Sequence, residues 1–349
     1  MYEGKILHVM HAEKFIEPFI EFIEGNFDNF ETRHTFFVWG ETTKFGIKSR
    51  FNLKSSNKRN IEKLKYVLAM AFAMQKAEKI ILHGLFVQLH LMLLFFMPWL
   101  LKKCYWVMWG GDLYVYQLGE RDWKWKVCEF FRRPVIKNIG HLVIYTLGDY
   151  QLAQKWYGAK GRLCRCFVYT SNMYKDYQVP ENTHISINIL VGNSADPSNN
   201  HLEVFDKLEA YKDQDIKIYA PLTYGNPDHA KQVIEEGKKR FGDKFEPLTE
   251  HMPFNQYLEF LGKIDIAIFN HERQQAMGNI RTLLGLGKKV YMNQSLTSTA
   301  TLNLDGITTF SLENFTLDPV FPQSKKNIEN IKKIFSEFNL KKCLSNVFD

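Results

Sequence analysis

The stretch HERQQAMGNIRTLLGLGKK, residues 271–289, follows the apolar run IDIAIF and carries an unusual set of polar groups. The apolar run is typical of a buried strand, and the pattern after position 279 predicts a helix. Between the two stand His271 and the six residues that we select as candidates for binding: Glu272, Arg273, Gln274, Gln275, Gly278 and Asn279. Guanidinium and amide groups there can donate to phosphate oxygens or sugar hydroxyls, and a helix start favours an anion. A polar loop with a small residue at a crowded turn is the plainer alternative.

A second candidate site follows the strand-like run ISINILV. Gly192, Asn193 and Ser194 come at its end, and Asp196 with Pro197 has the pattern of a helix N-cap followed by proline in the first turn. The glycine permits close approach of a ligand, and free amides at this helix start would bind a phosphate. A plain capped turn explains Asp196 and Pro197 equally well, but it leaves the three residues before them unexplained.

A third polar loop lies at the end of the run IKIYAP and adds Tyr219, Pro221 and Tyr224. In sheets of parallel strands, ligands bind beyond the carboxyl ends of the strands, so we expect these residues beside the two loops above. The acidic pair in DQD, residues 213–215, instead precedes its strand. We interpret it as a turn, and we predict no metal site.

Two loops of the first half offer a general base. His83 opens HGLF after the run KIIL, and Asp112 lies in WGGDLY after CYWVM. An imidazole or carboxylate at a strand end can take a proton from a hydroxyl. Asp112 is the first choice, because Gly110 and Gly111 permit a tight approach. The alternatives are that Asp112 caps the turn and that His83 makes structural hydrogen bonds.

These loops require a scaffold, which the strand and helix pattern supplies. The 349 residues suffice for about two domains. Strand-like runs alternate with helical stretches, and the alternation restarts after VPENTH. We predict an α/β fold of two doubly wound, Rossmann-like domains facing each other across a cleft, residues 1–182 and 183–349. The C-terminal tail can pack back on the first domain.

The cysteines and the N-terminus indicate a compartment. The five cysteines, with a C-x-C spacing at Cys164 and Cys166, form neither a zinc nor a disulfide framework, so we interpret them as unpaired thiols in a reducing cytosol. The chain opens on MYEGKILHVMH, with an acidic residue at position 3, and we expect no signal peptide.

The charge is distributed unevenly. Up to residue 188 the chain has 26 Lys and Arg against 17 Asp and Glu, and afterwards 19 against 21, so the excess of positive charge lies in the first half. A basic surface attracts nucleic acid, anionic lipid or phosphorylated substrates. We find no helix-turn-helix, zinc-finger or RNP-type motif, which argues against nucleic acid.

A segment of the first half favours the membrane. Residues 121–137 interleave aromatic and basic side chains, a composition that suits a headgroup layer. We predict that five of them face an anionic membrane surface: Trp123, Trp125, Lys126, Arg132 and Arg133. A solvated helix with a few core aromatics is the alternative. The apolar stretch 85–101 is interrupted by Gln88, His90 and Pro98, and we do not expect it to cross a bilayer.

Four of these segments together resemble glycosyltransferase family 56, the family of the 4-acetamido-4,6-dideoxygalactose transferase of enterobacterial common antigen synthesis. They are HGLF, WGGDLY, ILVGNSADPSNNHLEVFDKL, and RQQAMGN with the GKKV that follows it. The four segments occur along this chain in the same order as in the family. The linking segments and the C-terminal tail depart from the family, so the resemblance leaves the sugar and the acceptor open.

The resemblance implies a GT-B fold and an inverting transfer from a nucleotide-diphosphate sugar, with no metal and no other cofactor. The acceptor would be a polyprenyl-diphosphate-linked glycan of a bacterial surface polysaccharide. The enzyme would be peripheral, on the cytoplasmic face of the inner membrane. The loops after residues 191, 221 and 269 would then bind the donor, and Asp112 or His83 would act on the acceptor.

Two other functions fit parts of this pattern. A nucleotide-sugar epimerase would also have two such domains, but it would need no lipid acceptor and no aromatic and basic patch. A non-catalytic membrane adaptor would keep the fold and use only the patch.

Overall fold

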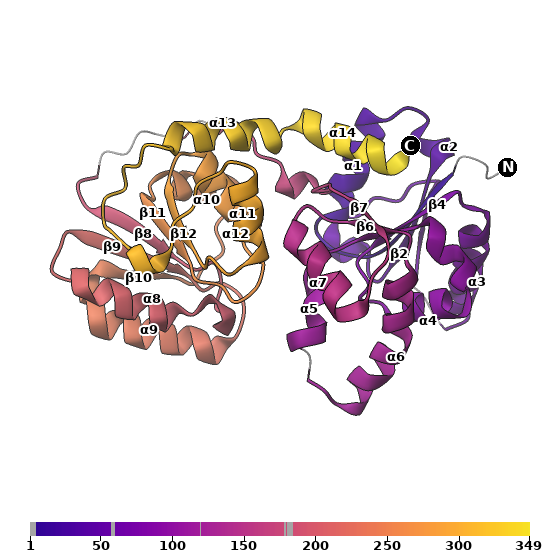
Figure 1. The fold of residues 1–349 in the computed structure, drawn as a ribbon, viewed down its shortest axis with the longest axis horizontal. Helices are drawn as coiled ribbons and strands as arrows, with labels where there is room; N and C mark the ends of the chain where they lie inside the picture. The colour runs from indigo at the N-terminus through magenta and orange to yellow at the C-terminus, as the bar shows by residue number, and fades with distance from the viewer. Residues whose placement is uncertain (1–4, 57–59, 119, 178, 180–183) are drawn as a thin grey trace. The chain divides into compact units, whose positions relative to one another are not determined.

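The computed structural model describes residues 5–56, 60–118, 120–177, 179 and 184–349, and it divides into two units (Figure 1). Unit 1 contains residues 1–171 and 337–349, and unit 2 contains residues 172–336. The predicted boundary between residues 182 and 183 lies outside the described residues. The structure instead divides the chain at 171/172, because Tyr174 and His184 already bond within unit 2, to Gly285 and Asp265.

Unit 1 is built on a seven-stranded sheet in the order β3-β2-β1-β4-β5-β6-β7, with every neighbouring pair parallel. Its strands are β1 Ile6–His11, β2 His34–Trp39, β3 Leu53–Ser55, β4 Lys79–His83, β5 Cys104–Val107, β6 His141–Val143 and β7 Arg162–Cys164. Most of the central residues are apolar and buried on both faces, as parallel strands covered by helices require.

Two layers of helices cover that sheet. One core joins the sheet to several helices, among them α3 Asn60–Lys76, α4 Gln88–Phe96, α6 Trp123–Asn138 and α7 Leu147–Tyr157. On the opposite face the ring of His8 contacts Phe19 of α1 (Ile16–Asn26) and Phe348 of α14 (Glu337–Phe348). The remaining helices are α2 Phe30–Arg33 and α5 Gly111–Leu118, and a 3-10 helix η2, Pro98–Lys103, follows α4.

Unit 2 repeats the design with a five-stranded parallel sheet in the order β10-β9-β8-β11-β12. Its strands are β8 Ile187–Val191, β9 Ile216–Pro221, β10 Phe245–Leu248, β11 Ile266–Phe269 and β12 Lys289–Met292. Its helices are α8 His201–Leu208, α9 Pro227–Phe241, α10 Phe254–Gly262, α11 Met277–Gly285, α12 Thr297–Leu304 and α13 Ser324–Ile334. The predicted α/β class with two doubly wound sheets is therefore confirmed.

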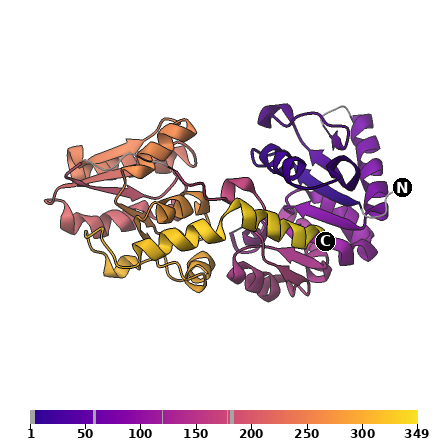
Figure 2. The same cartoon turned by 90° about the horizontal axis from the view of Figure 1, so that it is seen from above.

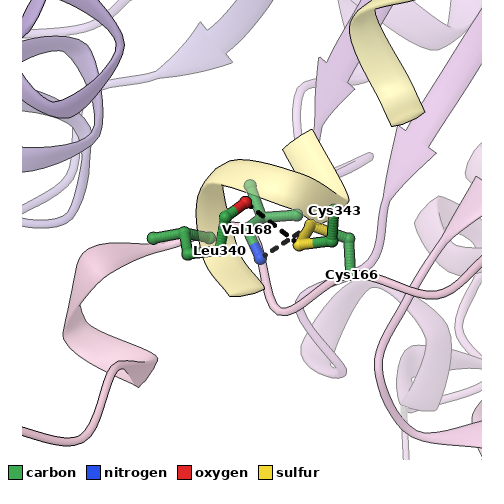
Figure 3. Close-up of a disulfide and its surroundings, with 4 residues drawn as sticks. All are labelled: Cys166, Val168, Leu340 and Cys343. Carbon is green, nitrogen blue, oxygen red and sulfur yellow. Dashed lines mark hydrogen bonds between the residues drawn. A yellow bond between two sulfur atoms is a disulfide. The ribbon is translucent and has the colours of Figure 1, made fainter. Parts of the chain in front are cut away.

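The C-terminal helix α14 belongs to unit 1 and is yellow in Figures 1 and 2. Its end is held by Arg33, whose guanidinium donates to the Phe348 carbonyl and the Asp349 carboxylate, each at 2.9 Å. Cys343 of this helix forms a disulfide with Cys166 in the loop after β7 (Figure 3). The prediction of unpaired thiols is therefore wrong for these two cysteines. Their separation of 177 residues gives no local spacing pattern, and only the return of the tail brings them together.

The apolar stretch 85–101 forms α4 and then η2, and Pro98 begins the second of these. A proline cannot donate the backbone hydrogen bond that a continuing helix needs. Among the described residues, no helix is both long enough and apolar enough to cross a membrane.

Candidate active site

Three loops meet at the carboxyl edge of the unit 2 sheet. The loop after β8 and the loop after β9 are joined by backbone hydrogen bonds, from Ala195 N–H to the Tyr224 carbonyl at 2.7 Å and from Asn226 N–H to the Ala195 carbonyl at 3.1 Å. The side-chain amide of Asn193 also donates to the Tyr224 hydroxyl at 2.9 Å. The structure thus brings Asn193 and Tyr224 together, as predicted from their positions at two strand ends.

Asn199 organises the first of these loops, and sequence reasoning did not single it out. Its Oδ1 accepts from the Asn193 N–H and faces Nε2 of His271, each at 3.0 Å, while its amide donates to the Asp196 carbonyl and the Ser194 hydroxyl. Gly192 has φ +69°, and a Cβ there would lie 2.7 Å from His201 Nε2. The glycine is therefore required by crowding inside the protein, which is a structural reason for a residue that the sequence left unexplained.

The helix expected directly after Asp196 does not form there. Asp196 caps a short 3-10 helix, η4 (Pro197–Asn199), by accepting from the Ser198 N–H at 2.9 Å. Asn200 then adopts a left-handed conformation with φ +52°, and α8 begins only at His201. Asp196 and Pro197 therefore take the predicted cap and first-turn positions, but on η4, and the turn at Asn200 separates them from the start of α8.

The third loop, residues 270–276, is tied to the first. Arg273 donates to the Asp196 carboxylate at 3.0 Å, Gln275 donates to the Ser198 hydroxyl at 3.3 Å, and the backbone N–H of Glu272 donates to the Ser198 carbonyl. The side-chain oxygen of Gln274 is buried and accepts no hydrogen bond in the described structure. Of the predicted residues here, the side chain of Glu272 is exposed.

The helix after this loop, α11, begins without a side-chain cap. Its N-cap residue is Ala276, in a left-handed conformation with φ +56°, and alanine has no oxygen to offer the first amides. Gly278 is exposed in the first turn, and the side chain of Asn279 donates to the Tyr257 hydroxyl at 2.9 Å. An uncapped helix start with positive partial charge suits an anion.

A pocket of about 520 Å³ lies between the loop after β9 and α9. It is lined by the loops after β8 and β9 and by α9, including Ala195, Tyr224, Asn226, Lys231 and Glu235. The pocket therefore opens beside the first two joined loops. Tyr219 lies away from it on β9, with its ring 5.2 Å from that of Phe260 in α10, and Pro221 is buried at the end of the same strand.

Two buried histidines of this edge are neutral at pH 7. Burial lowers the pKa of His201 to about 3, with the nearby His229 acting in the same direction. Burial also lowers the pKa of His271 to about 3, with Arg273 acting in the same direction. These two histidines therefore add no positive charge to the edge at pH 7.

In unit 1, the carboxylate of Asp112 is buried and accepts three hydrogen bonds. One oxygen accepts from the Leu85 N–H at 3.0 Å and from the Trp106 indole at 2.7 Å, and the other accepts from the Trp109 N–H at 3.0 Å. Only 1% of the residue is exposed. Burial raises the pKa of Asp112, and the three donors offset part of that rise. These contacts favour the structural alternative, in which Asp112 holds the loops after β4 and β5.

His83 is also enclosed, in a row of buried rings formed by Tyr169, His83, His8 and His34. Its Nδ1 lies 2.7 Å from the Tyr169 hydroxyl and its Nε2 lies 3.1 Å from His8, whose other nitrogen lies 2.9 Å from His34. Burial lowers the pKa of His83 to about 3 and that of His34 to about 4. The contacts of His83 again favour the structural alternative.

His11, at the end of β1, is a titratable residue of this edge that the sequence analysis did not select. Its ring is partly exposed and lies 4.8 Å from the ring of Trp109 and 5.1 Å from that of Phe86. Burial lowers the pKa of His11, while Glu13 and Asp112 raise it. His11 is the last residue of β1, just as His83 is the last residue of β4. This equivalent position at a strand end could have identified it.

The predicted membrane-facing residues lie on α6, but not all of them face outward. Trp123 is 69% exposed, Lys126 and Arg133 are exposed, and Trp125 is half-buried with its indole donating to the Val115 carbonyl. Arg132 is buried, paired with Glu129 and donating to the Leu85 carbonyl. The prediction that Arg132 faces a membrane is therefore wrong, because its guanidinium braces the loop after β4.

The acidic DQD segment lies in the turn before β9, at the amino edge of the sheet. Within the described ranges, no group of three or more His, Cys, Asp or Glu side chains is arranged to hold a metal ion.

Comparison with known proteins places the fold and the family. Residues 10–338 match the family model described as 4-alpha-L-fucosyltransferase glycosyl transferase group 56. A glycosyltransferase from Rickettsia africae has a TM-score of 0.65 at 14% identity, covering 99% of this chain and 97% of that one. An E. coli structure described as trehalose-6-phosphate bound with UDP-2-fluoro glucose has a TM-score of 0.64 at 10% identity, covering 99% of both chains. At these identities the likeness shows the fold alone, which is of the GT-B type.

Proposed function

Because the chain belongs to the group 56 glycosyltransferases, we propose that it moves a sugar from a nucleotide-diphosphate donor to a polyprenyl-diphosphate-linked glycan. The match over residues 10–338 is the observation that carries the proposal. We propose an amino or deoxy sugar, and a site on the cytoplasmic face of a bacterial inner membrane during surface polysaccharide synthesis. The E. coli neighbour, described as bound with UDP-2-fluoro glucose, supports a nucleotide sugar as the partner.

We assign donor binding to unit 2. The start of α11 has no side-chain cap, Arg273 lies beside it, and the buried oxygen of Gln274 accepts no bond from described residues. A leaving nucleoside diphosphate develops negative charge, and preorganised amides with a guanidinium can stabilise that charge. Such a site needs neither a metal nor another cofactor.

We assign the general base to His11 ahead of Asp112 and His83. In an inverting transfer the acceptor oxygen attacks C1 of the sugar, the bond from C1 to the phosphate oxygen breaks, and the nucleoside diphosphate leaves with the electron pair. The acceptor proton must pass to a base. The imidazole of His11 is partly exposed and its pKa is lowered below 6.5, so it is largely neutral at pH 7. The two earlier candidates are enclosed by their own hydrogen bonds.

Family membership and fold favour a transferase over an epimerase or a non-catalytic adaptor. The test is incubation with radiolabelled nucleotide sugars and a bacterial lipid extract. Label entering the organic phase supports the proposal. A changed free nucleotide sugar would support the epimerase, and no change with any donor would leave the adaptor.

A further inference from the structure

We propose that unit 1 docks on an anionic membrane through the outer sides of α3, α4, η2 and α6, a surface much wider than the α6 patch predicted from the sequence. We call it the three-helix surface, after the α-helices α3, α4 and α6. The proposal rests on the proposed function, because a lipid-linked acceptor is reached only at a bilayer.

The three-helix surface gathers large apolar side chains that the fold leaves in solvent. Eight of the fifteen exposed large hydrophobic residues in the described part of the chain lie on these elements, so they are not scattered at random. They are Leu64, Leu68 and Phe72 on α3, Phe96 on α4, Trp99 on η2, and Trp123, Val127 and Phe130 on α6. All are between 42% and 69% exposed. Contiguous exposed apolar surface of this kind marks an interaction site.

The stripe on α3 is independent of the patch that the sequence indicated. Leu64, Leu68 and Phe72 are spaced four residues apart, so they lie on one face of the helix. The opposite face packs into the core through Tyr66, Met70 and Met74. The helix is therefore apolar on both faces, and only the inner face is covered by the protein.

Side-chain contacts join the elements into one surface. Gln75 of α3 accepts from the Trp99 indole at 3.0 Å and lies 3.3 Å from the sulfur of Met97. The rings of α4 then meet those of α6, with Phe95 at 5.5 Å from Phe130 and Phe96 at 6.3 Å from Phe131. The apolar residues thus continue from α3 through η2 and α4 to α6.

Basic side chains surround this apolar surface. The exposed cations on the same elements are Lys63, Lys65, Lys76, Lys102, Lys124, Lys126, Arg133 and Lys137. The ammonium of Lys76 lies 4.4 Å from the ring centre of Phe72, and that of Lys124 lies 5.8 Å from Trp123. Among the described side chains of these elements, Glu129 is the acidic one, and it is buried against Arg132 and Arg133.

This charge pattern selects a membrane as the occupant. Aromatic rings partition into the interface, while lysines meet anionic headgroups. A second copy of the chain that paired through the same surface would bring lysines against lysines, which is unfavourable. The surface also adjoins the proposed acceptor edge, since α4 begins two residues after Phe86, which contacts His11.

The test is flotation of the full chain with vesicles of 30% phosphatidylglycerol in phosphatidylcholine, against vesicles of phosphatidylcholine alone. The decisive variant carries Leu64→Ser, Leu68→Ser and Phe72→Ser, which leave the α6 patch intact. The matched control carries Ile185→Ser, Leu304→Ser and Val320→Ser, three residues of unit 2 that are at least as exposed. Circular dichroism checks that both variants fold.

We expect the α3 variant to bind anionic vesicles at least tenfold more weakly than the wild type, and the control to bind normally. A second variant, Lys63→Gln with Lys65→Gln and Lys76→Gln, should lose the preference for the anionic lipid. Normal flotation of the α3 variant would overturn the proposal. A second result would also overturn it: the wild type is a dimer, and the α3 variant is a monomer that still binds vesicles normally.

Transfer to a water-soluble, short-chain acceptor analogue is measured in parallel. The α3 variant should keep this activity. A wild type that floats but transfers nothing to any acceptor would refute the proposed function and leave the three-helix surface standing.

Discussion

The guanidinium of Arg273 lies 3.0 Å from the carboxylate of Asp196, so a side chain next to the open start of α11 is held by the loop after β8. The side chain of Arg273 is 30% exposed, so its guanidinium is open to a ligand as well as paired with Asp196. We expect Arg273→Ala to weaken nucleoside diphosphate binding about tenfold or more, since a hydrogen bond to a charged group contributes roughly 1.5–3 kcal/mol. Calorimetric titration with nucleoside diphosphates measures it. Arg240→Ala removes another paired arginine of unit 2 and is the control; equal affinities for both variants would contradict the assignment.

Metal removal should leave the reaction intact. The donor site is proposed to meet the charge of the diphosphate with the amides at the start of α11 and with Arg273. Turnover in excess EDTA should equal turnover in the untreated enzyme. If activity disappears in EDTA and magnesium restores it, the metal-free account is wrong.

Two substitutions separate the base from the structural carboxylate. His11→Gln should keep the fold and donor affinity and lower the transfer rate by about 10²–10⁴, the usual contribution of a general base. The acid limb of the wild-type rate profile should fall below pH 6.5, because burial lowers the pKa of His11.

Asp112→Asn should act mainly on stability, because an amide cannot accept all three N–H donors that surround the carboxylate. Thermal unfolding and donor titration are compared for both variants. Full activity of His11→Gln together with a stable, inactive Asp112→Asn would return the role to Asp112.

Acid should destabilise the protein well above the pH at which carboxylates protonate. His83, His90, His201 and His271 have folded pKa values of about 3, below the unfolded value of 6.5. Between these values the unfolded chain binds more protons, so stability is complete above pH 6.5 and decreases as the pH falls. Each histidine contributes a slope of up to about 1.4 kcal/mol per pH unit.

Urea unfolding at pH 7, 6 and 5 tests this slope. His90→Phe should make the slope shallower, because it removes one of the four titrating groups. The substitution loses no hydrogen bond at Nε2, which is buried without a partner among the described residues. His251→Gln, at an exposed position, should not change it. A free energy of unfolding that stays constant from pH 7 to pH 5 would contradict the expectation.

The hydrophobic pattern of the sequence predicted most of the fold. Ten of the twelve strands in the described residues contain apolar or aromatic runs that can be recognised from the strand's own sequence. The strands β3 (Leu53–Ser55) and β7 (Arg162–Cys164) were missed, since three residues with polar neighbours show no alternation. Both are edge strands that depend on a partner for their conformation.

The site was predictable in its loops but not in its contacts. Strand ends located Asn193, Tyr224 and Arg273 correctly at one edge. The roles of Asn199 and Arg132 could not be predicted, because each is defined by partners far along the chain: His271 for the first and Leu85 for the second.

Mass spectrometry of the lipid product shows whether the protein transfers a sugar to a lipid-linked glycan. Purified enzyme, a panel of nucleotide sugars and a polyprenyl-diphosphate-linked glycan fraction are incubated, and the lipid masses are compared before and after. We expect that one donor raises the mass of the lipid-linked glycan by a single sugar residue, with one nucleoside diphosphate released for each. A lipid fraction of unchanged mass with every donor, while a nucleotide sugar is hydrolysed or epimerised, would contradict it.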